Sequence, residues 1–222
     1  MKKIGFLFFI ISQFAMGQFS FCEGSKGDSI FTEDFGSGTT YGPALPAGVT
    51  NYNYVAGCPN DGSYTIYNSN NCFGWHSNGD HTPGDTNGKH LIVNASYTAG
   101  EFYSRTVSGL CENTTYEFSA WLINLLPNST PNCPNGGIPI NIKFQILNAI
   151  DNSVLVEADT GDLSGTLTPN WNQYALTFTS PPGQTNVVLK MINNGAGGCG
   201  NDLGIDDIMF RSCGDLTTLT TG

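Results

Sequence analysis

The sequence contains few charged residues and very few cationic ones. Charged side chains make up 12% of the 222 residues, and Lys and Arg together number only 8, so the formal net charge is −10. That charged fraction is about half the usual value for a globular protein. An acidic chain with so few cations is a poor partner for the phosphates of nucleic acids or for anionic membranes. We therefore expect no nucleic-acid partner, and a neutral molecule or a cation instead.

The sequence also lacks the short motifs that mark common enzyme classes. It contains no G-x-S-x-G, no H-E-x-x-H and no phosphate-binding P-loop. Its three histidines, His76, His81 and His90, do not have the spacing of a zinc site. A glycosidase needs two carboxylates across a cleft, and no feature of the sequence selects such a pair. These absences predict that the chain is not an enzyme.

Apolar runs long enough to cross a membrane are missing after the first residues, so we expect no membrane insertion. Residues 1–17 predict a secretory signal peptide instead. Lys2 and Lys3 provide its positive start, an apolar stretch follows, and Ala15-Met16-Gly17 matches a small-x-small cleavage site. The protein is therefore expected to be secreted or to lie on the cell surface.

Seven cysteines follow the leader, and no two of them form a C-x-x-C pair. The missing pair argues against zinc-ribbon and thioredoxin-like sites. In an exported protein, cysteines usually form disulfides, each of which stabilises the fold by ~2–4 kcal/mol. An odd number leaves one thiol over, and we expect it to be Cys22, near the mature N-terminus.

What the sequence does contain is a series of short segments with alternating apolar and polar residues. The clearest are Thr115–Leu125, Ile138–Leu147 and Trp171–Thr179. Alternation with period two is typical of strands with one buried face, and no segment shows a helical period. About ten such segments, separated by turn-forming residues, predict an all-β sandwich of two antiparallel sheets.

The expected organisation is a single domain. Residues 1–17 are the signal peptide, 18–29 an N-terminal lead, 30–213 the sandwich and 214–222 the start of a linker. Within the sandwich, residues 39–88 are mostly loop, and so long an irregular stretch tends to carry function.

Two adjacent carboxylates, Asp206 and Asp207, interrupt the last apolar strand, Leu203–Phe210. Because successive strand residues point to opposite faces, one of them must face inward or lie under a loop. A buried carboxylate is costly unless it is paired, hydrogen-bonded or metal-bound. Cations are scarce in this chain, so Ca²⁺ is the favoured partner. The alternative is that both side chains lie in water at a frayed strand end.

Several short motifs occur in an order that resembles jelly-roll modules of the MAM type. The motifs are Cys72-Phe73-Gly74-Trp75, Asp80-His81-Thr82, Gly88-Lys89-His90-Leu91, Cys111 before Tyr116-Glu117-Phe118, Trp171, and Gly204-Ile205-Asp206-Asp207-Ile208 before Cys213. The chain is also similar to the calcium-containing carbohydrate-binding modules of the galactose-binding-like sandwiches. Its segments FTEDFGSG and GGCGND also resemble exported proteins of Bacteroidetes-type bacteria. The cysteine that the MAM family has at its first strand is absent beside Phe35.

The resemblance implies a disulfide-stabilised jelly roll with a disulfide between Cys111 and Cys213. The simplest remaining pairs are then Cys58 with Cys72 and Cys133 with Cys199. The resemblance also implies a structural Ca²⁺ that joins the first strand, the loop before His90 and the Asp206 strand. The expected metal ligands are Glu33, Asp34, Asp85, Asn87, Lys89, Asp206 and Asp207.

Aromatic residues in the long loop and on one strand face offer surfaces on which sugar rings stack. The expected ligand-binding residues are Tyr54, Tyr67, Trp75, Glu117 and Trp121. Trp75 is the first choice for a stacking ring, and the alternative is that it plugs the end of the sandwich. The sequence thus predicts a non-catalytic, calcium-supported module that binds a neutral glycan or a cell-surface partner. The alternative is a structural or adhesive domain of a large surface protein with no small ligand.

Overall fold

The computed structural model describes residues 17–69 and 72–214, and in these ranges the chain forms two β-sheets. One short 3₁₀ turn, η1 (Pro134–Gly136), lies between strands. The strands are β1 (Lys26–Glu33), β2 (Asn53–Tyr54), β3 (Ser63–Tyr67), β4 (His90–Asn94), β5 (Glu101–Ser108), β6 (Thr115–Asn124), β7 (Ile142–Asn148), β8 (Val154–Asp159), β9 (Asn172–Thr179), β10 (Asn186–Asn193) and β11 (Asp202–Cys213).

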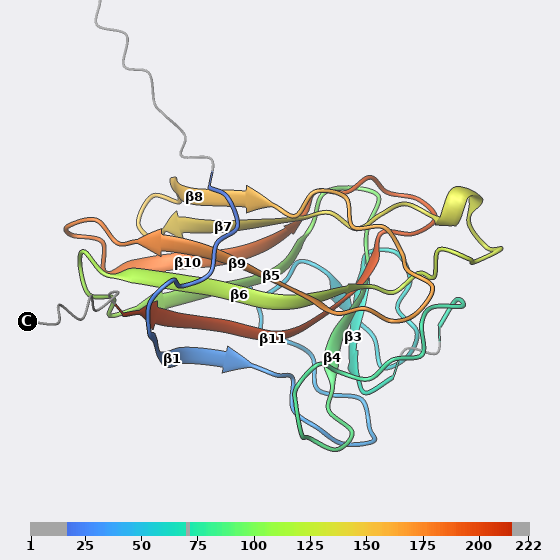
Figure 1. Ribbon diagram of the computed structural model, residues 1–222. Coiled ribbons are helices and arrows are strands. Elements are labelled where there is room, and N and C mark those ends of the chain that lie inside the picture. Colours follow the sequence, from blue (N-terminus) through green and yellow to red (C-terminus); the bar gives the residue numbers. More distant parts are fainter. Residues whose placement is uncertain (1–16, 70–71, 215–222) are drawn as a thin grey trace, which may run out of the picture.

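The two sheets are stacked as a sandwich (Figure 1). The larger sheet has the order β2-β3-β4-β11-β6-β9, and β1 pairs with β11 beyond the end of β4. The smaller sheet has the order β5-β10-β7-β8. All pairings are antiparallel except that of β2 with β3. The predicted all-β jelly-roll sandwich is therefore confirmed.

The core lies between the sheets and follows the predicted alternation. On β6 the inward residues are Tyr116, Phe118, Ala120 and Leu122, all of them buried in the main apolar cluster. Aromatic rings from both sheets meet there, and the ring centroids of Phe118 and Phe144 are 5.3 Å apart. Burial of apolar surface on this scale is the dominant favourable term in folding.

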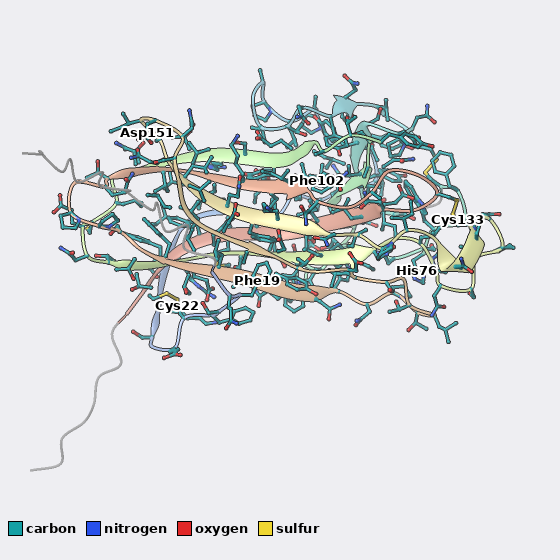
Figure 2. All side chains as sticks on the ribbon, turned by 90° about the horizontal axis from the view of Figure 1, so that it is seen from above. Phe19, Cys22, His76, Phe102, Cys133 and Asp151 are labelled. Atoms are coloured by element: carbon teal, nitrogen blue, oxygen red, sulfur yellow. A yellow bond between two sulfur atoms is a disulfide. The ribbon has the colours of Figure 1, made fainter. Side chains whose placement is uncertain are left out.

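The segment before β1 closes one side of the sandwich. Gly17 donates its backbone N–H to the carbonyl of Glu157 on β8, and Ser20 donates to that of Ala175 on β9. The ring of Phe19, which precedes Ser20 in this segment, packs 5.3 Å from the ring of Tyr174 on β9 (Figure 2). Part of the expected N-terminal lead is therefore ordered structure, and β1 already begins at Lys26. The predicted signal peptide and linker lie outside the described residues, apart from Gly17 and Gly214.

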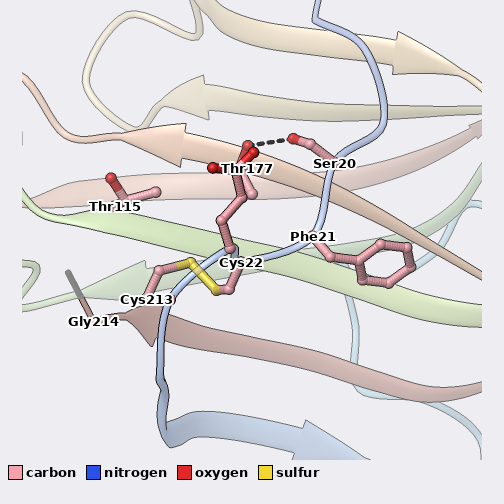
Figure 3. Close-up of a pocket in the computed structure, with 9 residues that line it drawn as sticks. Ser20, Phe21, Cys22, Thr115, Thr177, Cys213 and Gly214 are labelled. Atoms are coloured by element: carbon pink, nitrogen blue, oxygen red, sulfur yellow. Dashed lines mark hydrogen bonds between the residues drawn. A yellow bond between two sulfur atoms is a disulfide. The ribbon is translucent and has the colours of Figure 1, made fainter. Parts of the chain in front are cut away.

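The disulfide predicted between Cys111 and Cys213 is wrong, and Cys22 is not the unpaired cysteine. Cys22 is bonded to Cys213 with a Cα–Cα distance of 5.4 Å (Figure 3). The N-terminal segment crosses β9 and β6, where the N–H of Cys22 is held by Glu117, so Cys22 reaches the end of β11. Cys111 is exposed and has a free thiol in a turn after β5.

The other two disulfides lie at one end of the sandwich. They pair Cys58 with Cys72 and Cys133 with Cys199, the two pairs that were expected as the simplest remaining ones. Cys133 and the neighbouring His76 mark this end in Figure 2. Among the described residues, no helix is long and apolar enough to span a membrane.

Candidate functional site

The candidate site lies on the outer face of the larger sheet, which is turned away from the core. On β11, Leu203 and Ile205 belong to the core, so the alternating residues Asp202, Gly204 and Asp206 face outward. A second apolar cluster covers this face. Its buried members are Trp75, Ile92, Ile123, Leu125, Leu126 and Cys133, with Trp171 packed against them. Two buried carboxyl groups thus flank an apolar layer on one strand.

Asp202 lies at the foot of a pocket of about 230 Å³. Phe73 and Trp75 provide its aromatic wall, and the Cys133–Cys199 disulfide lines the opposite part. The other polar side chains of the lining are the amides of Asn60, Asn94 and Asn132 and the carboxyl group of Asp61. The pocket therefore combines ring surfaces with hydrogen-bonding groups, the usual composition of a small-molecule site.

The carboxyl group of Asp202 is only 7% exposed and is bonded on one side only. The indole N–H of Trp75 donates to Oδ2 at 3.0 Å, whereas Oδ1 is buried without a hydrogen-bond partner in the described residues. Burial raises the pKa of Asp202 to about 7. The hydrogen bond from Trp75 and the backbone of Ala95 lower this pKa, and the nearby charge of Asp61 raises it further. Both protonation states are thus populated near neutral pH, which suits a general acid or base.

Phe73 is held at the mouth of this pocket in an unusual backbone conformation. Its φ is 51°, a left-handed value that non-glycine residues rarely adopt. The preceding Cys72 is disulfide-bonded, and the amide of Asn132 donates to the Phe73 carbonyl at 3.2 Å. The ring remains 50% exposed and meets Trp75 edge to face at 5.3 Å. Strain of this kind occurs often at binding sites, because neighbouring structure has to impose it.

The second carboxyl group, Asp206, lies with Asp207 under the loop before β4. A bulge in the pairing of β11 with β6 adds one residue after Asp206, and Asp207 takes a φ of 45°. Asp206 accepts the backbone N–H groups of His81 at 2.6 Å and of Asp207 at 2.9 Å. Asp207 accepts from the Thr82 hydroxyl, and its Oδ2 lies 2.8 Å from Nδ1 of His81. Both aspartates therefore lie under the loop, where strict alternation predicted only one.

Trp121 does not offer a free ring face on this surface. The His81 imidazole stacks on it with centroids 3.5 Å apart. Burial raises the pKa of the neighbouring Asp206 carboxyl to about 8. The Asp206 region is thus a closed arrangement of protein groups, whereas the Asp202 region has an open pocket.

The predicted calcium ligands do not converge as a set. The register pairs Glu33 with Ile208, a core residue, so Glu33 faces inward while Asp206 faces outward. Asp34 is exposed and accepts the N–H of Gly36. Asn87 and Lys89 bond through backbone groups to the loop after β1. In residues 17–69 and 72–214, no group of three or more His, Cys, Asp or Glu side chains is placed to hold a metal ion.

Asp85 does meet another carboxylate, that of Asp80, which the predicted set omitted. A Cβ on Gly88 would lie 2.2 Å from Oδ2 of Asp80 and 2.2 Å from Oδ1 of Asp85, so the two oxygens point at nearly the same place. Oδ2 of Asp80 is buried without a described hydrogen-bond partner. Burial and the charge of Asp85 raise the pKa of Asp80. Carboxylate oxygens arranged in this way fit a hard cation such as Ca²⁺.

The other predicted ligand-binding residues are not free stacking surfaces. Trp75 is buried, so it plugs the end of the sandwich, the alternative to a stacking ring. Glu117 is fully buried in an ion pair with Arg211. The Tyr54 hydroxyl donates to the carbonyl of Gly42, and Tyr67 stacks on Tyr41 with centroids 4.3 Å apart.

Sequence reasoning missed Asp202, although the strand pattern held a signal for it. Asp202, Gly204 and Asp206 are two residues apart, so one strand places both carboxylates on the same face. The predicted strand began at Leu203, which left Asp202 in the loop. The pocket wall was not foreseeable in this way, because it needs Phe73 and Cys199 brought together by two disulfides.

No protein-family model matches the chain, and no curated protein sequence matches it. Among solved structures, a cyclase from Fischerella sp. TAU in complex with 4-(1H-indol-3-yl)butan-2-one superposes with a TM-score of 0.52 and 14% identity, over 81% of this chain and 91% of that one. The CBM22-1 xylan-binding domain from Paenibacillus barcinonensis Xyn10C gives a TM-score of 0.47 and 11% identity, over 86% and 97%. A structure described as CBM4 gives 0.39 and 14%, over 67% and 86%. At such identities the likeness concerns the fold alone.

These neighbours correct two predictions. The chain was expected to be a non-catalytic, calcium-supported glycan-binding module, or else a structural or adhesive domain. The cyclase from Fischerella contradicts that expectation as far as the fold goes, since a sandwich of similar fold in that protein is an enzyme crystallised with a small organic ligand. The prediction that the chain is not an enzyme is corrected as well, because the missing motifs belong to other folds and do not exclude catalysis on this one. The resemblance to carbohydrate-binding modules extends to their jelly-roll-like fold, while membership of the MAM type stays a prediction.

Proposed function

We propose that this chain is an enzyme that catalyses proton transfer to a small neutral molecule bound in the Asp202 pocket. One feature carries the proposal: a carboxyl group whose pKa burial raises to about 7, and whose Oδ1 has no hydrogen-bond partner in the described residues, belongs to a residue that lines a pocket with an aromatic wall. Catalytic acids need a pKa near the working pH, and burial is the usual way in which proteins raise that of a carboxyl.

The two oxygens of Asp202 have separate roles in this proposal. Protonated Oδ1 donates to the substrate, and the remaining negative charge is stabilised by the Trp75 N–H on Oδ2. The hydrogen bond also fixes the plane of the carboxyl group, so that the donor keeps one direction. When the carboxylate takes a proton back, from the product or from water, the cycle closes.

The pocket lining supports a ring-bearing substrate. The half-exposed Phe73 offers an apolar ring surface, the buried Trp75 packs behind it, and three asparagine amides offer donors and acceptors. A volume of about 230 Å³ is below the usual range for drug-sized ligands, so one or two rings fit best. The sequence predicted a neutral molecule as the partner, and this proposal takes neutral molecules as the class of substrate. The indole-bearing ligand of the cyclase from Fischerella and a single sugar ring both have suitable size.

The test is deuterium incorporation from heavy water into candidate substrates, followed by NMR. The panel contains 3-substituted indoles and neutral mono- and disaccharides. We expect turnover of one class, with a pH profile whose apparent pKa is near 7. Asp202→Asn should lower the rate at least about 100-fold, the usual scale for one general acid. Asp151→Asn, an exposed change at the opposite end (Figure 2), is the matched control. Full activity of Asp202→Asn, or no turnover of the panel by the wild type, contradicts the proposal.

Secretion and a structural Ca²⁺ are part of the same proposal. Three disulfides and the apolar leader support export. For the cation, Asp80 and Asp85 provide two converging carboxylate oxygens, one of them without another partner. A cation there would remove the repulsion between the two carboxylates. It would also link two positions of the loop before β4, those of Asp80 and Asp85.

A further inference from the structure

A second cavity, of about 390 Å³, is lined by Glu33 at the end of β1, by residues 103–106 of β5 and by the loop 45–49. It has no lining residue in common with the Asp202 pocket. The loop 45–49 covers it, and Ser104 on β5 donates its N–H to the carbonyl of Val49. Three chemically active side chains line it: Glu33, Tyr103 and Arg105.

Arg105 is a cation that no carboxylate of the described residues pairs with. Arg211, Lys190 and Lys143 each form an ion pair with a carboxylate, and among the described residues Arg105 forms none. Its guanidinium lies over the ring of Phe31 instead, 4.3 Å from the centroid, and close to the Tyr103 hydroxyl. The ring and the phenol hold the planar group in one orientation, which favours two-point binding of a carboxylate.

Glu33 brings the opposite charge to the same cavity. Its register against the core residue Ile208 turns it toward the inside of the sandwich. One carboxylate oxygen accepts the N–H of Phe35 at 3.3 Å. The Tyr103 pKa, which burial raises, responds also to both charges, so both lie near its hydroxyl. Glu33 and Arg105 nevertheless do not pair with each other in the described residues, whose ion pairs are formed by other side chains.

Two opposite charges that face one cavity without meeting are matched by a ligand that carries both charges. We propose that this cavity binds a small zwitterion of the α-amino-acid type. Its carboxylate meets the guanidinium of Arg105 and the phenol of Tyr103, and its ammonium meets Glu33. The apolar side chain of such a ligand lies against Leu45, Pro46 and Val49 of the covering loop. The volume is within the range of small-molecule sites.

The experiment uses L-leucine as the probe, because it carries both charges and an apolar side chain. Backbone amide signals of the whole chain are followed by NMR during titration with L-leucine, N-acetyl-L-leucine and L-leucinamide. We expect L-leucine to shift signals of residues 45–49 and of Tyr103 and Arg105. Each analogue, which lacks one of the two charges, should bind at least tenfold more weakly. Equal binding of L-leucine and either analogue, or no shift with L-leucine, overturns the proposal.

Variants test the same point from the protein side. Arg105→Gln and Glu33→Gln should each weaken L-leucine binding at least tenfold. Lys26→Gln, which removes a cation outside the cavity, should leave it unchanged. Melting curves show whether each variant is folded, and the analogue series on the wild-type chain decides the question even where a variant does not fold. Unchanged binding by folded Arg105→Gln contradicts the proposal.

Discussion

The indole N–H of Trp75 is hydrogen-bonded at 3.0 Å to a carboxyl oxygen of Asp202, and both side chains are buried. One contact thus joins the plug at the end of the sandwich to the proposed proton donor. A change in the ring therefore affects packing and the direction of the carboxyl group together.

Replacing Trp75 by Ala should cost about 3–5 kcal/mol of unfolding free energy, because it empties a buried site and leaves Asp202 without its donor. Phe73→Ala, at a half-exposed ring of the same wall, should cost less than about 1 kcal/mol. Urea unfolding of both variants measures the difference. Equal, small losses would mean that Trp75 is not a plug.

The Asp202 carboxyl should make stability fall as pH rises. Its folded pKa of about 7 is above the unfolded value of 3.8, so the folded state holds the proton more tightly. That contribution is complete below about pH 4 and is lost as pH rises toward 7. Each pKa unit corresponds to about 1.4 kcal/mol. Asp202→Asn should therefore gain stability relative to the wild type by about 3–4 kcal/mol between pH 4 and pH 8. The check is the urea midpoint of each protein, measured across this pH range. A constant difference between the midpoints of wild type and Asp202→Asn would refute the prediction.

Calcium should stabilise the loop before β4 through Asp80 and Asp85. Because the ion would bind only the folded chain, millimolar CaCl₂ should raise the melting temperature above that in EDTA. Asp80→Asn should abolish the calcium-dependent rise, whereas Asp28→Asn, in β1, should retain it. A melting temperature that does not respond to CaCl₂ in the wild type would end the calcium proposal.

The cysteines should behave unequally. Cys111→Ser should change stability by less than about 0.5 kcal/mol, because the thiol is exposed and unbonded. Cys22→Ser should cost about 2–5 kcal/mol, since it opens the Cys22–Cys213 disulfide. Thermal melts test both variants, and peptide mapping of the oxidised chain identifies the bonded pairs. A peptide that links Cys111 to Cys213 would contradict the structure.

The fold could be predicted from the sequence, because alternation in strands such as β6 records burial directly. The site could be predicted only in part. Alternation placed Asp206 and Asp207 on opposite faces, and a bulge with a positive φ at Asp207 broke that rule. Nothing local in the sequence signals such a bulge, which depends on the pairing of two strands.

The disulfide error has a different physical origin. Cys22 was left unpaired because chain ends are usually loosely held. Here the N-terminal segment is anchored by Phe19 against Tyr174 and by the bond of Ser20 to Ala175. Those contacts join residues more than 150 positions apart, and no sequence period reports them. The pocket around Asp202 escaped prediction for the same reason.

The disulfide between Cys22 and Cys213 also determines how the molecule responds to a pulling force. It joins residues that are 191 positions apart, one before β1 and one at the end of β11. Tension applied to the chain on either side of this pair passes through a covalent bond and not through the strand pairs between them. The strands between Cys22 and Cys213 would stay folded under load. Gly17–Phe21, which precede Cys22, would detach from the sheets first. Reduction of this disulfide would turn a mechanically shielded sandwich into an extensible one.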